Sequence, residues 1–574
     1  MDLSFEQRLL RFLAREEEGE RKSYRDLHAL SVEDRVLEGE CIMDATCVAA
    51  DGAGFTLRVA ENLSKFRAGD AVCVGDGLDL DAAVPLVYES FDANSHALRL
   101  GFDPFARGEA CELRLGGHYC VDRRPLGLRG RLQECVREAF RVPAIREALL
   151  GSSPPGRDAQ RFARAEKALA ARGLNPAQVR AGAAAIATES LALVQGPPGT
   201  GKTALLAEVL ALLCGAGCRI ALSAFTHRAV DNALRMLRKV DPGLALIKLG
   251  GGEPDPELAA AGVRFLRPKG CRLPERGVVV AATCFQLAKL PPDTSFHYAV
   301  FDEAGQLPIP HALAGMLLSR RWLFFGDHAQ LPPVITADHG DAEVTASVFE
   351  HLHARYGSEL LDLSYRMNDG ICGLVSALFY ADRLRPEPLA ATRRLPFVPG
   401  GALDEVLDPA HPVVLARIDH LQPGQRAIEE ANLAADLVAE LVRRHGVAQE
   451  QIAVVAPFRA QLRAIRTALQ KKGVPRDDAV VVDTVERIQG QERDVVILSL
   501  TAGDPDSLAH RAAFFYSTNR LNVALSRART KVVVIGSASA FAALPQDLPS
   551  LRAATVFRRL YRRVPQVDLT RVYS

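Results

Sequence analysis

The chain lacks an excess of charge of either sign. Its 574 residues include 70 lysine and arginine residues against 69 aspartate and glutamate residues, which gives a formal net charge of +1. A strongly basic protein attracts polyanions over much of its surface, and this composition excludes that mode of binding. Any surface that binds nucleic acid must therefore be local.

Long apolar runs and closely paired cysteines are also missing. No apolar stretch approaches the ~18 residues that a membrane-spanning helix requires, and the segment from Met1 to Arg21 is amphipathic and rich in glutamate, unlike a secretion signal. The eleven cysteines form no C-x-x-C pair, so we expect reduced core thiols rather than zinc ligands or disulfides. These absences predict a cytoplasmic globular protein with no membrane partner.

Apolar periodicity divides the chain into an N-terminal accessory part and two α/β lobes. Helical spacing near Phe5 and again over about 130–150 flanks a region where Phe55–Val59 alternates and Ala71–Val74 is a short apolar run, which predicts a small β-barrel between helices. From Gln178 onward, apolar strands alternate with helical segments, as in parallel sheets. The predicted domains are a stalk helix (1–34), a β-barrel (35–124), stalk helices (125–172), lobe 1 (173–345) and lobe 2 (346–574).

One octet predicts binding of a nucleoside triphosphate. Residues Gly196 to Thr203 fit G-x-x-x-x-G-K-[ST], with the apolar run Leu191–Val194 before them and helical spacing after them. In such a loop, backbone N–H groups surround the phosphates at a helix N-terminus, Lys202 neutralises phosphate oxygens and the Thr203 hydroxyl ligates Mg²⁺. The predicted nucleotide contacts are Gly196, Pro197, Pro198, Gly199, Thr200, Gly201, Lys202 and Thr203.

Two later loops carry the groups that hydrolysis needs. Asp302 and Glu303 follow the apolar run Tyr298–Phe301, at a strand's carboxyl end, where α/β sheets bind ligands. We expect Asp302 to hold the metal and Glu303 to deprotonate the attacking water. An isolated Asp-Glu pair would more simply be a solvated turn. After the next strand, the Gln330 amide is expected to contact both γ-phosphate and water.

The second lobe supplies candidate cations. Arg366, in Tyr365-Arg366-Met367, and Arg529, in Ser526-Arg527-Ala528-Arg529, are predicted arginine fingers for the charge that develops on the γ-phosphoryl group. Fingers from the opposite lobe would make ATP close the cleft between the lobes. The alternative for Arg527 and Arg529 is a solvated helix face, because charged side chains usually lie outside.

Taken together, the motifs resemble those of superfamily 1 helicases. Their order matches that family over about 174–536, and most closely its 5′-to-3′ branch, which includes the nonsense-mediated-decay and immunoglobulin-mu-binding helicases. The resemblance implies two RecA-like lobes with a β-barrel on helical stalks, and ATP with Mg²⁺ as cofactors. It also implies that Gln178 reads the adenine edge, that Tyr365 stacks on the ring and that Glu492 lies near the ribose or the γ-phosphate.

The resemblance also implies a path for a single strand across both lobes. The matching positions are Ser223, Thr226, His227, Thr283 and Thr484. Hydroxyl and backbone N–H groups bind phosphates without reading sequence. Each of these residues is equally an ordinary strand-end or cap residue, and His227 is equally a buried, hydrogen-bonded histidine. Two departures from the family pattern are the short connection over 241–276 and Asn368, which stands where many relatives have histidine.

The leading functional hypothesis is an ATP-dependent helicase that moves 5′ to 3′ on single-stranded DNA or RNA, with the direction taken from the resemblance alone. An ATP-gated clamp that binds strands without processive unwinding is the alternative, motivated by the short connection over 241–276. A small-molecule kinase would use the phosphate loop but leaves Gln330 and the paired arginines unexplained.

Overall fold

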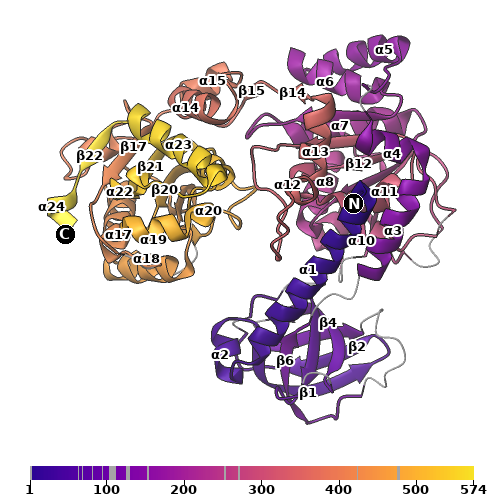
Figure 1. The fold of residues 1–574 in the computed structure, drawn as a ribbon, viewed down its shortest axis with the longest axis horizontal. Coiled ribbons are helices and arrows are strands. Elements are labelled where there is room, and N and C mark those ends of the chain that lie inside the picture. Colours follow the sequence, from indigo (N-terminus) through magenta and orange to yellow (C-terminus); the bar gives the residue numbers. More distant parts are fainter. Residues whose placement is uncertain are drawn as a thin grey trace.

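The described part of the chain forms two α/β lobes that lie side by side, with a small barrel held away from them at the end of a long helix (Figure 1). This computed structural model describes residues 3–573 except 63, 67–68, 80–81, 93–94, 103–111, 125–128, 152–153, 251–253, 269–271, 292, 423–424 and 475–478. The chain begins beside the first lobe and ends on the outer side of the second lobe (Figure 1).

A long helix, α1 (Phe5–His28), attaches the barrel to the first lobe. Its apolar face, which includes Leu9, Phe12 and Leu13, is buried against α3 (Arg129–Arg141) and joins the apolar core of the first lobe. Full burial of such a side chain contributes about 1.5–3 kcal/mol. The first half of α1 is therefore part of the core of the first lobe, while its second half extends to the barrel (Figure 1).

Six strands close the barrel in the order β1-β2-β5-β4-β3-β6, with antiparallel neighbours. The strands are β1 (Cys41–Asp51), β2 (Gly54–Arg58), β3 (Ala71–Gly75), β4 (Val84–Asp92), β5 (Ala97–Phe102) and β6 (His118–Arg123). The barrel has its own apolar interior. A short helix, α2 (Val32–Leu37), packs on β1.

A buried ion pair fixes α2 to the barrel. The Nε of Arg35 lies 2.9 Å from the Asp122 carboxylate on β6, and Arg35 also donates hydrogen bonds to the carbonyl oxygens of Gly77 and Leu30. Arg35 and Asp122 are 2% and 1% exposed. A charge removed from water to this degree is costly unless its partner is present.

Four more helices lead from the barrel to the first lobe: α3, α4 (Pro143–Leu150), α5 (Ala159–Ala170) and α6 (Pro176–Ala187). Pro143 begins α4, where its missing N–H group costs nothing, so the helical region predicted over 130–150 is interrupted there. Helices α5 and α6 pack on each other around a small apolar cluster.

The first lobe contains a sheet of eight strands in the order β10-β9-β11-β8-β12-β13-β7-β14, with parallel neighbours. The strands are β7 (Leu191–Gln195), β8 (Arg219–Ala224), β9 (Ala245–Leu249), β10 (Arg264–Leu266), β11 (Val278–Thr283), β12 (Tyr298–Phe301), β13 (Trp322–Gly326) and β14 (Glu359–Leu360). The helices are α7 (Lys202–Gly215), α8 (His227–Val240), α9 (Pro256–Ala260), α10 (Cys284–Leu287), α11 (Ile309–Met316), α12 (Ala342–Thr345) and α13 (Val348–Tyr356). Helices α6, α7 and α8 cover one face, and α11, α13 and the stalk cover the other.

The first lobe continues past the predicted boundary at residue 345. Helix α13 packs into its apolar core through Val348, Phe349 and Leu352. Strand β14 then pairs with β7 at the edge of the same sheet. The chain therefore enters the second lobe only after Leu360, because the sheet edge at β7 takes one more strand.

The second lobe contains a sheet of six strands in the order β19-β18-β20-β21-β17-β22, also with parallel neighbours. The strands are β17 (Val413–Arg417), β18 (Ile452–Val455), β19 (Val481–Asp483), β20 (Arg493–Ser499), β21 (Ala528–Gly536) and β22 (Gln566–Asp568), with a separate pair β15 (Leu363–Ser364) and β16 (Arg385–Pro386). The helices are α14 (Asp369–Phe379), α15 (Pro388–Ala391), α16 (Asp404–Leu407), α17 (Ile428–Arg443), α18 (Arg459–Lys471), α19 (Pro505–His510), α20 (Ala512–Phe515), α21 (Thr518–Leu525), α22 (Ser539–Ala542), α23 (Leu548–Arg563) and α24 (Thr570–Tyr573).

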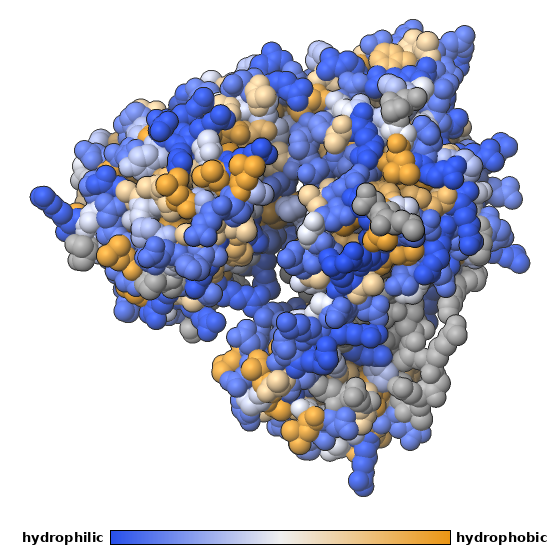
Figure 2. Space-filling view, in the orientation of Figure 1, coloured by the Kyte–Doolittle hydropathy of each residue, from blue (hydrophilic) through white to orange (hydrophobic). Residues whose placement is uncertain are grey.

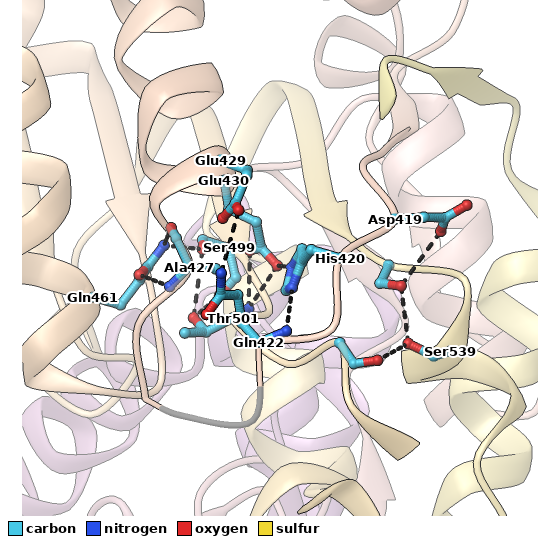
Figure 3. A network of polar contacts seen from close by, with 12 residues as sticks. Asp419, His420, Gln422, Ala427, Glu429, Glu430, Gln461, Ser499, Thr501 and Ser539 are labelled. Atoms are coloured by element: carbon cyan, nitrogen blue, oxygen red, sulfur yellow. Dashed lines mark hydrogen bonds and ion pairs between the residues drawn. The ribbon is translucent and has the colours of Figure 1, made fainter. Parts of the chain in front are cut away.

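A buried carboxylate holds the chain that follows β20 (Figure 3). Glu430 is fully buried and accepts hydrogen bonds from the Ser499 hydroxyl at 2.6 Å and from the Thr501 N–H at 2.9 Å. Thr501 has φ +70°, which a β-branched residue rarely adopts. The His420 ring lies 2.9 Å from Glu430; burial opposes its charged form, but Glu430 outweighs this and raises the pKa of His420.

The predicted fold class is confirmed, with two parallel α/β lobes and an N-terminal barrel. In the first sheet β12, β13 and β7 are neighbours, so the loops at their carboxyl ends meet at one edge. The face in view is mostly hydrophilic and is hollowed where the two lobes and the barrel approach one another (Figure 2). Among the described residues, no helix has both the length and the apolar character needed to cross a membrane.

Removing one partner of the barrel's ion pair tests its contribution. Replacing Asp122 with alanine leaves the Arg35 charge buried and unpaired, which costs about 3–5 kcal/mol. We expect faster amide hydrogen exchange throughout β3 and β6, measured by mass spectrometry. Asp44→Ala is the control, because Asp44 forms an exposed pair with His118. Unchanged exchange in Asp122→Ala would contradict the prediction.

Candidate functional site where the two lobes meet

The phosphate loop joins β7 to α7. Gly199 and Gly201 have φ of +74° and +76°, the left-handed region that glycine adopts without strain. Helix α7 begins at Lys202, and no side chain caps its N-terminus. The first N–H groups of a helix lack partners within it and, with the helix dipole, favour an anion. This end of α7 therefore has the geometry of a phosphate site.

Lys202 lies between two carboxylates at the base of the pocket. Its Nζ is 2.9 Å from Glu303 and 3.3 Å from Asp302, and the residue is only 8% exposed. Burial opposes the charged form, but Glu303 and Asp302 outweigh it and raise the pKa of Lys202. A Cβ atom at Gly196 would lie 2.6 Å from the Cβ of Lys202, so the first glycine leaves room for this side chain.

Asp302 and Glu303 follow β12 directly. Asp302 is 3% exposed and accepts a hydrogen bond from the Glu303 N–H, while Glu303 has a left-handed φ of +51°. Burial raises the pKa of Asp302, with Lys202 opposing. Burial also acts to raise that of Glu303, but Lys202 outweighs it and the pKa of Glu303 is lowered. Glu303 is therefore ionised at neutral pH and available as a proton acceptor.

The Gln330 loop (residues 327–341) follows the neighbouring strand β13. Its first residue, Asp327, is 3% exposed and accepts hydrogen bonds from Gln195 at 3.1 Å, from Gln330 at 2.9 Å and from the Tyr380 hydroxyl at 2.7 Å. Gln195 ends β7 and Tyr380 belongs to the second lobe. One carboxylate therefore joins the Gln330 side chain, the strand before the phosphate loop and the opposite lobe.

The second lobe lies directly against the phosphate loop. The Tyr365 N–H donates to the Gly199 carbonyl oxygen at 2.8 Å, and the Ser364 hydroxyl donates to that of Pro198 at 3.0 Å. A Cβ atom at Gly199 would lie 2.5 Å from the Cβ of Arg366. The candidate site therefore includes residues of both lobes, and Arg366 lies beside the phosphate loop.

Of the two arginines Arg527 and Arg529, Arg527 is the more deeply buried. It is 4% exposed and donates to the carbonyl oxygens of Val523 and Gln491. Burial, with the nearby Arg366, lowers the pKa of Arg527 to about 9, while Glu303 of the first lobe acts against this. The alternative of a solvated helix face is wrong for Arg527. Nothing in the local sequence distinguishes Arg527 from Arg529, because an arginine finger and a solvated helix face are equally compatible with each.

Arg529 instead pairs with acids of its own lobe. It contacts Glu492 and lies 3.4 Å from Asp494. Glu492 also binds the Nε of Arg366 at 2.9 Å. Burial opposes the charge on Glu492, but Arg529 and Arg366 outweigh it and lower the pKa of Glu492 to about 2. Glu492 thus fixes Arg366 beside the phosphate loop, and Arg529 holds Glu492.

The two predicted adenine contacts lie on the other side of the phosphate loop. Gln178 is 5% exposed; its Oε1 accepts from the Asn175 N–H, and its Nε2 donates to the Thr200 carbonyl oxygen at 3.1 Å. Tyr365 is 40% exposed, and its hydroxyl accepts a hydrogen bond from Asn175 at 2.9 Å. Asn175 therefore brings both predicted residues to one corner of the pocket.

The predicted strand contacts divide into exposed and buried residues. Thr226 is exposed, and its side chain accepts from the Ala229 N–H at the start of α8; the adjacent His227 and the distant Thr484 are partly exposed. Ser223 is 1% exposed and its hydroxyl donates to the Ala282 carbonyl oxygen; Thr283 is 4% exposed. The two buried residues therefore have no free surface for a phosphate. Burial lowers the pKa of His227, with Lys248 adding to the effect.

One other group among the described residues has metal-ligand spacing, and its hydrogen bonding argues against a metal. Asp404, Glu440 and His445 each present a ligand atom within 4.8 Å of the others. The Nδ1 of His445 accepts a hydrogen bond from the Val398 N–H at 3.0 Å, so the neutral ring carries its proton on Nε2. A metal-bound histidine instead donates through its second nitrogen.

Comparisons with known proteins agree with the motifs. Two family models, each described as an AAA domain, match residues 173–263 and 344–539. The chain is similar to the DNA replication ATP-dependent helicase/nuclease DNA2 of Saccharomyces cerevisiae, at 29% identity over 62% of this chain and 25% of that protein. It is similar to DNA2 of Mus musculus, at 28% identity over 65% of this chain and 38% of that protein. It is also similar to the DNA replication ATP-dependent helicase/nuclease JHS1 of Arabidopsis thaliana, at 28% identity over 65% of this chain and 29% of that protein.

The chain therefore spans about a quarter to two fifths of the length of these relatives. Among solved structures, one that it resembles is the crystal structure of Arterivirus nonstructural protein 10 (helicase). The TM-score is 0.39 at 16% identity, over 88% of this chain and 80% of that chain.

A methyl group at Gly199 should separate the lobes at the pocket. Gly199→Ala introduces a Cβ atom against Arg366, and overpacking of this kind costs about 1–3 kcal/mol. We expect affinity for a nucleoside triphosphate, measured by calorimetry, to fall about tenfold. Gly217→Ala is the matched control: Gly217 also has a positive φ, but a Cβ atom added there would meet no other group within 4 Å. Equal affinities in the two variants would refute the contact.

Proposed function

Because this chain belongs to the superfamily 1 helicases, we propose that it couples ATP hydrolysis to 5′-to-3′ movement along a single nucleic-acid strand, with duplex unwinding. One observation carries the proposal: the phosphate loop of the first lobe is in direct contact with the segment of the second lobe that bears Arg366. A ligand bound there touches both lobes, so its hydrolysis changes their separation.

In the proposed reaction, the N–H groups at the start of α7 and the Lys202 ammonium bind the phosphates. The Thr203 hydroxyl and the Asp302 carboxylate supply hard oxygen ligands of the kind that Mg²⁺ prefers, and they lie at the same end of the first sheet. When bound, the ion neutralises phosphate charge. Lys202 pairs with Asp302 and Glu303 in this structure, and a bound cation that takes over this role lets Lys202 turn to the phosphates.

Glu303 is the proposed base for the attacking water. Its lowered pKa keeps it ionised, and Lys202 holds it at 2.9 Å. Gln330, tied to Asp327, is the proposed contact between γ-phosphate and water. Phosphoryl transfer depends mostly on positioning and charge stabilisation, so a fixed base and a fixed amide meet its requirements.

Arg366 and Arg527 are the proposed cations for the developing charge. Both guanidinium groups are largely buried, and burial strengthens their interaction with an anion by excluding water. Arg529 has a supporting role in this proposal, because its contacts with Glu492 and Asp494 occupy it within the second lobe. Gln178 and Tyr365 are the proposed adenine contacts, with Glu492 near the ribose or the γ-phosphate.

Single-stranded DNA is the proposed substrate, because the names of the relatives specify DNA replication. Thr226, His227 and Thr484 remain the proposed phosphate contacts, since each retains some exposed surface. Such contacts bind the backbone without sequence preference. RNA is the comparison substrate in the experiment below.

An ATP-gated clamp remains the second candidate, on one observation. Between α8 and β11, the described residues extend the sheet with the short elements β9, α9 and β10 rather than adding a separate helical unit. A first lobe without a separate helical unit at this place offers less surface to hold a strand during stepping than a first lobe with one. This candidate predicts nucleotide-dependent strand affinity without multi-turnover unwinding.

The proposed motor is tested by its ATPase and unwinding activities. We expect single-stranded DNA to stimulate ATP hydrolysis, and we expect unwinding of a duplex with a 5′ overhang but not of one with a 3′ overhang. Lys202→Ala should abolish both activities. ATPase rates indifferent to DNA and to RNA would refute the motor, and a 3′-overhang preference would refute the direction. Stimulation without multi-turnover unwinding would support the clamp.

Turnover measurements distinguish the role of Arg527, which directly precedes β21, from that of Arg529, which lies within it. Arg527→Ala should lower kcat for ATP by about 10³-fold or more, as expected for a cation that stabilises the transition state. Arg529→Ala should have a smaller effect, because it acts through Glu492 and Arg366. Steady-state kinetics with calorimetric nucleotide affinities provide the measurement. A larger loss of kcat in Arg529→Ala would restore Arg529 as the finger.

A further inference from the structure

The second lobe binds the first half of the Gln330 loop through hydrogen bonds and apolar contact. The side-chain amide of Asn519 donates hydrogen bonds to the carbonyl oxygens of Gln330 and His328, the latter at 3.0 Å. Asn522 donates to the Ala329 carbonyl oxygen at 2.8 Å. Leu331 is 7% exposed and belongs to the apolar core of the second lobe. Residues 328–331 are therefore attached to the second lobe, although the strand that precedes them, β13, belongs to the first.

The second half of the same loop is hydrogen-bonded to the stalk helix α1. The Glu16 carboxylate, on α1, accepts hydrogen bonds from the Thr336 hydroxyl at 2.8 Å and from the N–H groups of Thr336 and Ala337 at 3.1 and 2.9 Å. The Nε2 of His339 lies 2.8 Å from Glu16, and its ring stacks on Phe12 at 4.5 Å. Burial opposes ionisation of Glu16, but His339 and the N–H groups outweigh it and lower its pKa.

Attachment of the stalk does not by itself require Glu16. The apolar face of α1 is already buried in the first lobe, and Arg8 pairs with Asp341 and Glu343 at 2.8 Å each. A buried carboxylate is a costly way to add to such an attachment. Here it fixes backbone that has no strand or helix partners, so the position of this segment depends on its side-chain anchors.

We infer that Glu16 is a positioning residue that links the Gln330 loop to the helix carrying the barrel. The inference rests on the proposed ATP-driven movement of the lobes. Movement of the second lobe shifts residues 328–331 through Asn519, and Glu16 passes that shift to α1. Helix α1 runs on from Glu16 to His28, a distance of about 18 Å at ~1.5 Å per residue, so a small tilt at Glu16 becomes a larger displacement of the barrel at the far end of the helix (Figure 1). Barrel position is thereby tied to nucleotide state.

Hydrogen exchange with and without Mg²⁺ and a non-hydrolysable ATP analogue tests the link. The proteins compared are the full chain, Glu16→Ala and the matched control Glu18→Ala, whose exposed side chain lies two residues further along α1. We expect the analogue to protect the phosphate loop in all three. It should change exchange in α1 in the parent chain and the control, but not in Glu16→Ala.

Asn519→Ala provides a variant that leaves the stalk untouched. It removes the grip of the second lobe on the Gln330 loop, and we expect it to abolish the nucleotide-dependent change in α1 as well. This outcome cannot arise from a purely structural role of Glu16. It also keeps the inference falsifiable if Glu16→Ala fails to fold.

Turnover gives a second readout. Loss of a coupling free energy of the usual size corresponds to a change of about 5-fold or more, so Glu16→Ala should lower strand-stimulated ATPase by that factor while the unstimulated rate stays within about twofold. Glu16→Gln keeps one acceptor oxygen and should recover part of the stimulation. A parallel loss of both rates would assign Glu16 a structural role only and overturn the inference.

The outcomes separate the two proposals. If the analogue protects the phosphate loop and α1 still responds in Glu16→Ala and in Asn519→Ala, the positioning role is refuted while the proposed ATP site stands. If the analogue gives no protection of the phosphate loop in the parent chain, the proposed function fails and the inference fails with it.

Discussion

The nucleotide pocket depends on the contact between Tyr365 and Gly199. A backbone hydrogen bond of 2.8 Å between them brings the second lobe against the phosphate loop, and only a glycine leaves room there for the Cβ of Arg366. Arg366 stands beside the loop, Glu492 can hold Arg366 from behind, and Arg527 comes within the electrostatic reach of Glu303.

Buried charge is compensated in part within each lobe. Lys202 pairs with both Asp302 and Glu303 in the first lobe, and Glu492 pairs with both Arg366 and Arg529 in the second. Paired charges tolerate burial where single ones do not, so the pocket remains stable before a ligand binds. In the proposed function, a triphosphate with its metal ion offers partners to the charged groups of both lobes at once. Under that proposal, the exchange of partners is what couples nucleotide binding to the contact between the lobes.

A local motif predicts residues from their neighbours in the chain, whereas burial depends on elements distant in the sequence. The phosphate loop and the acids after β12 are predictable, because a glycine pattern or a strand end marks each of them. The motif favours Arg529 as the finger, but Arg527 is the more buried of the two, and Glu303 is among the charges that act on it. Ser223 was proposed for strand binding and is buried. Asn368, unexplained by its motif, caps α14 and donates to the Thr530 carbonyl oxygen.

By itself the sequence determined the class of fold and the motif residues of the candidate site. Glycines with left-handed backbone, a lysine at a helix start and acids after an apolar strand act within a few residues of one another, so their spacing reveals them. Only the tertiary structure decided which arginine is buried, where the first lobe ends, and that Glu16 contacts a loop 320 residues away. Those outcomes depend on burial and on partners from other elements, and no local pattern records either.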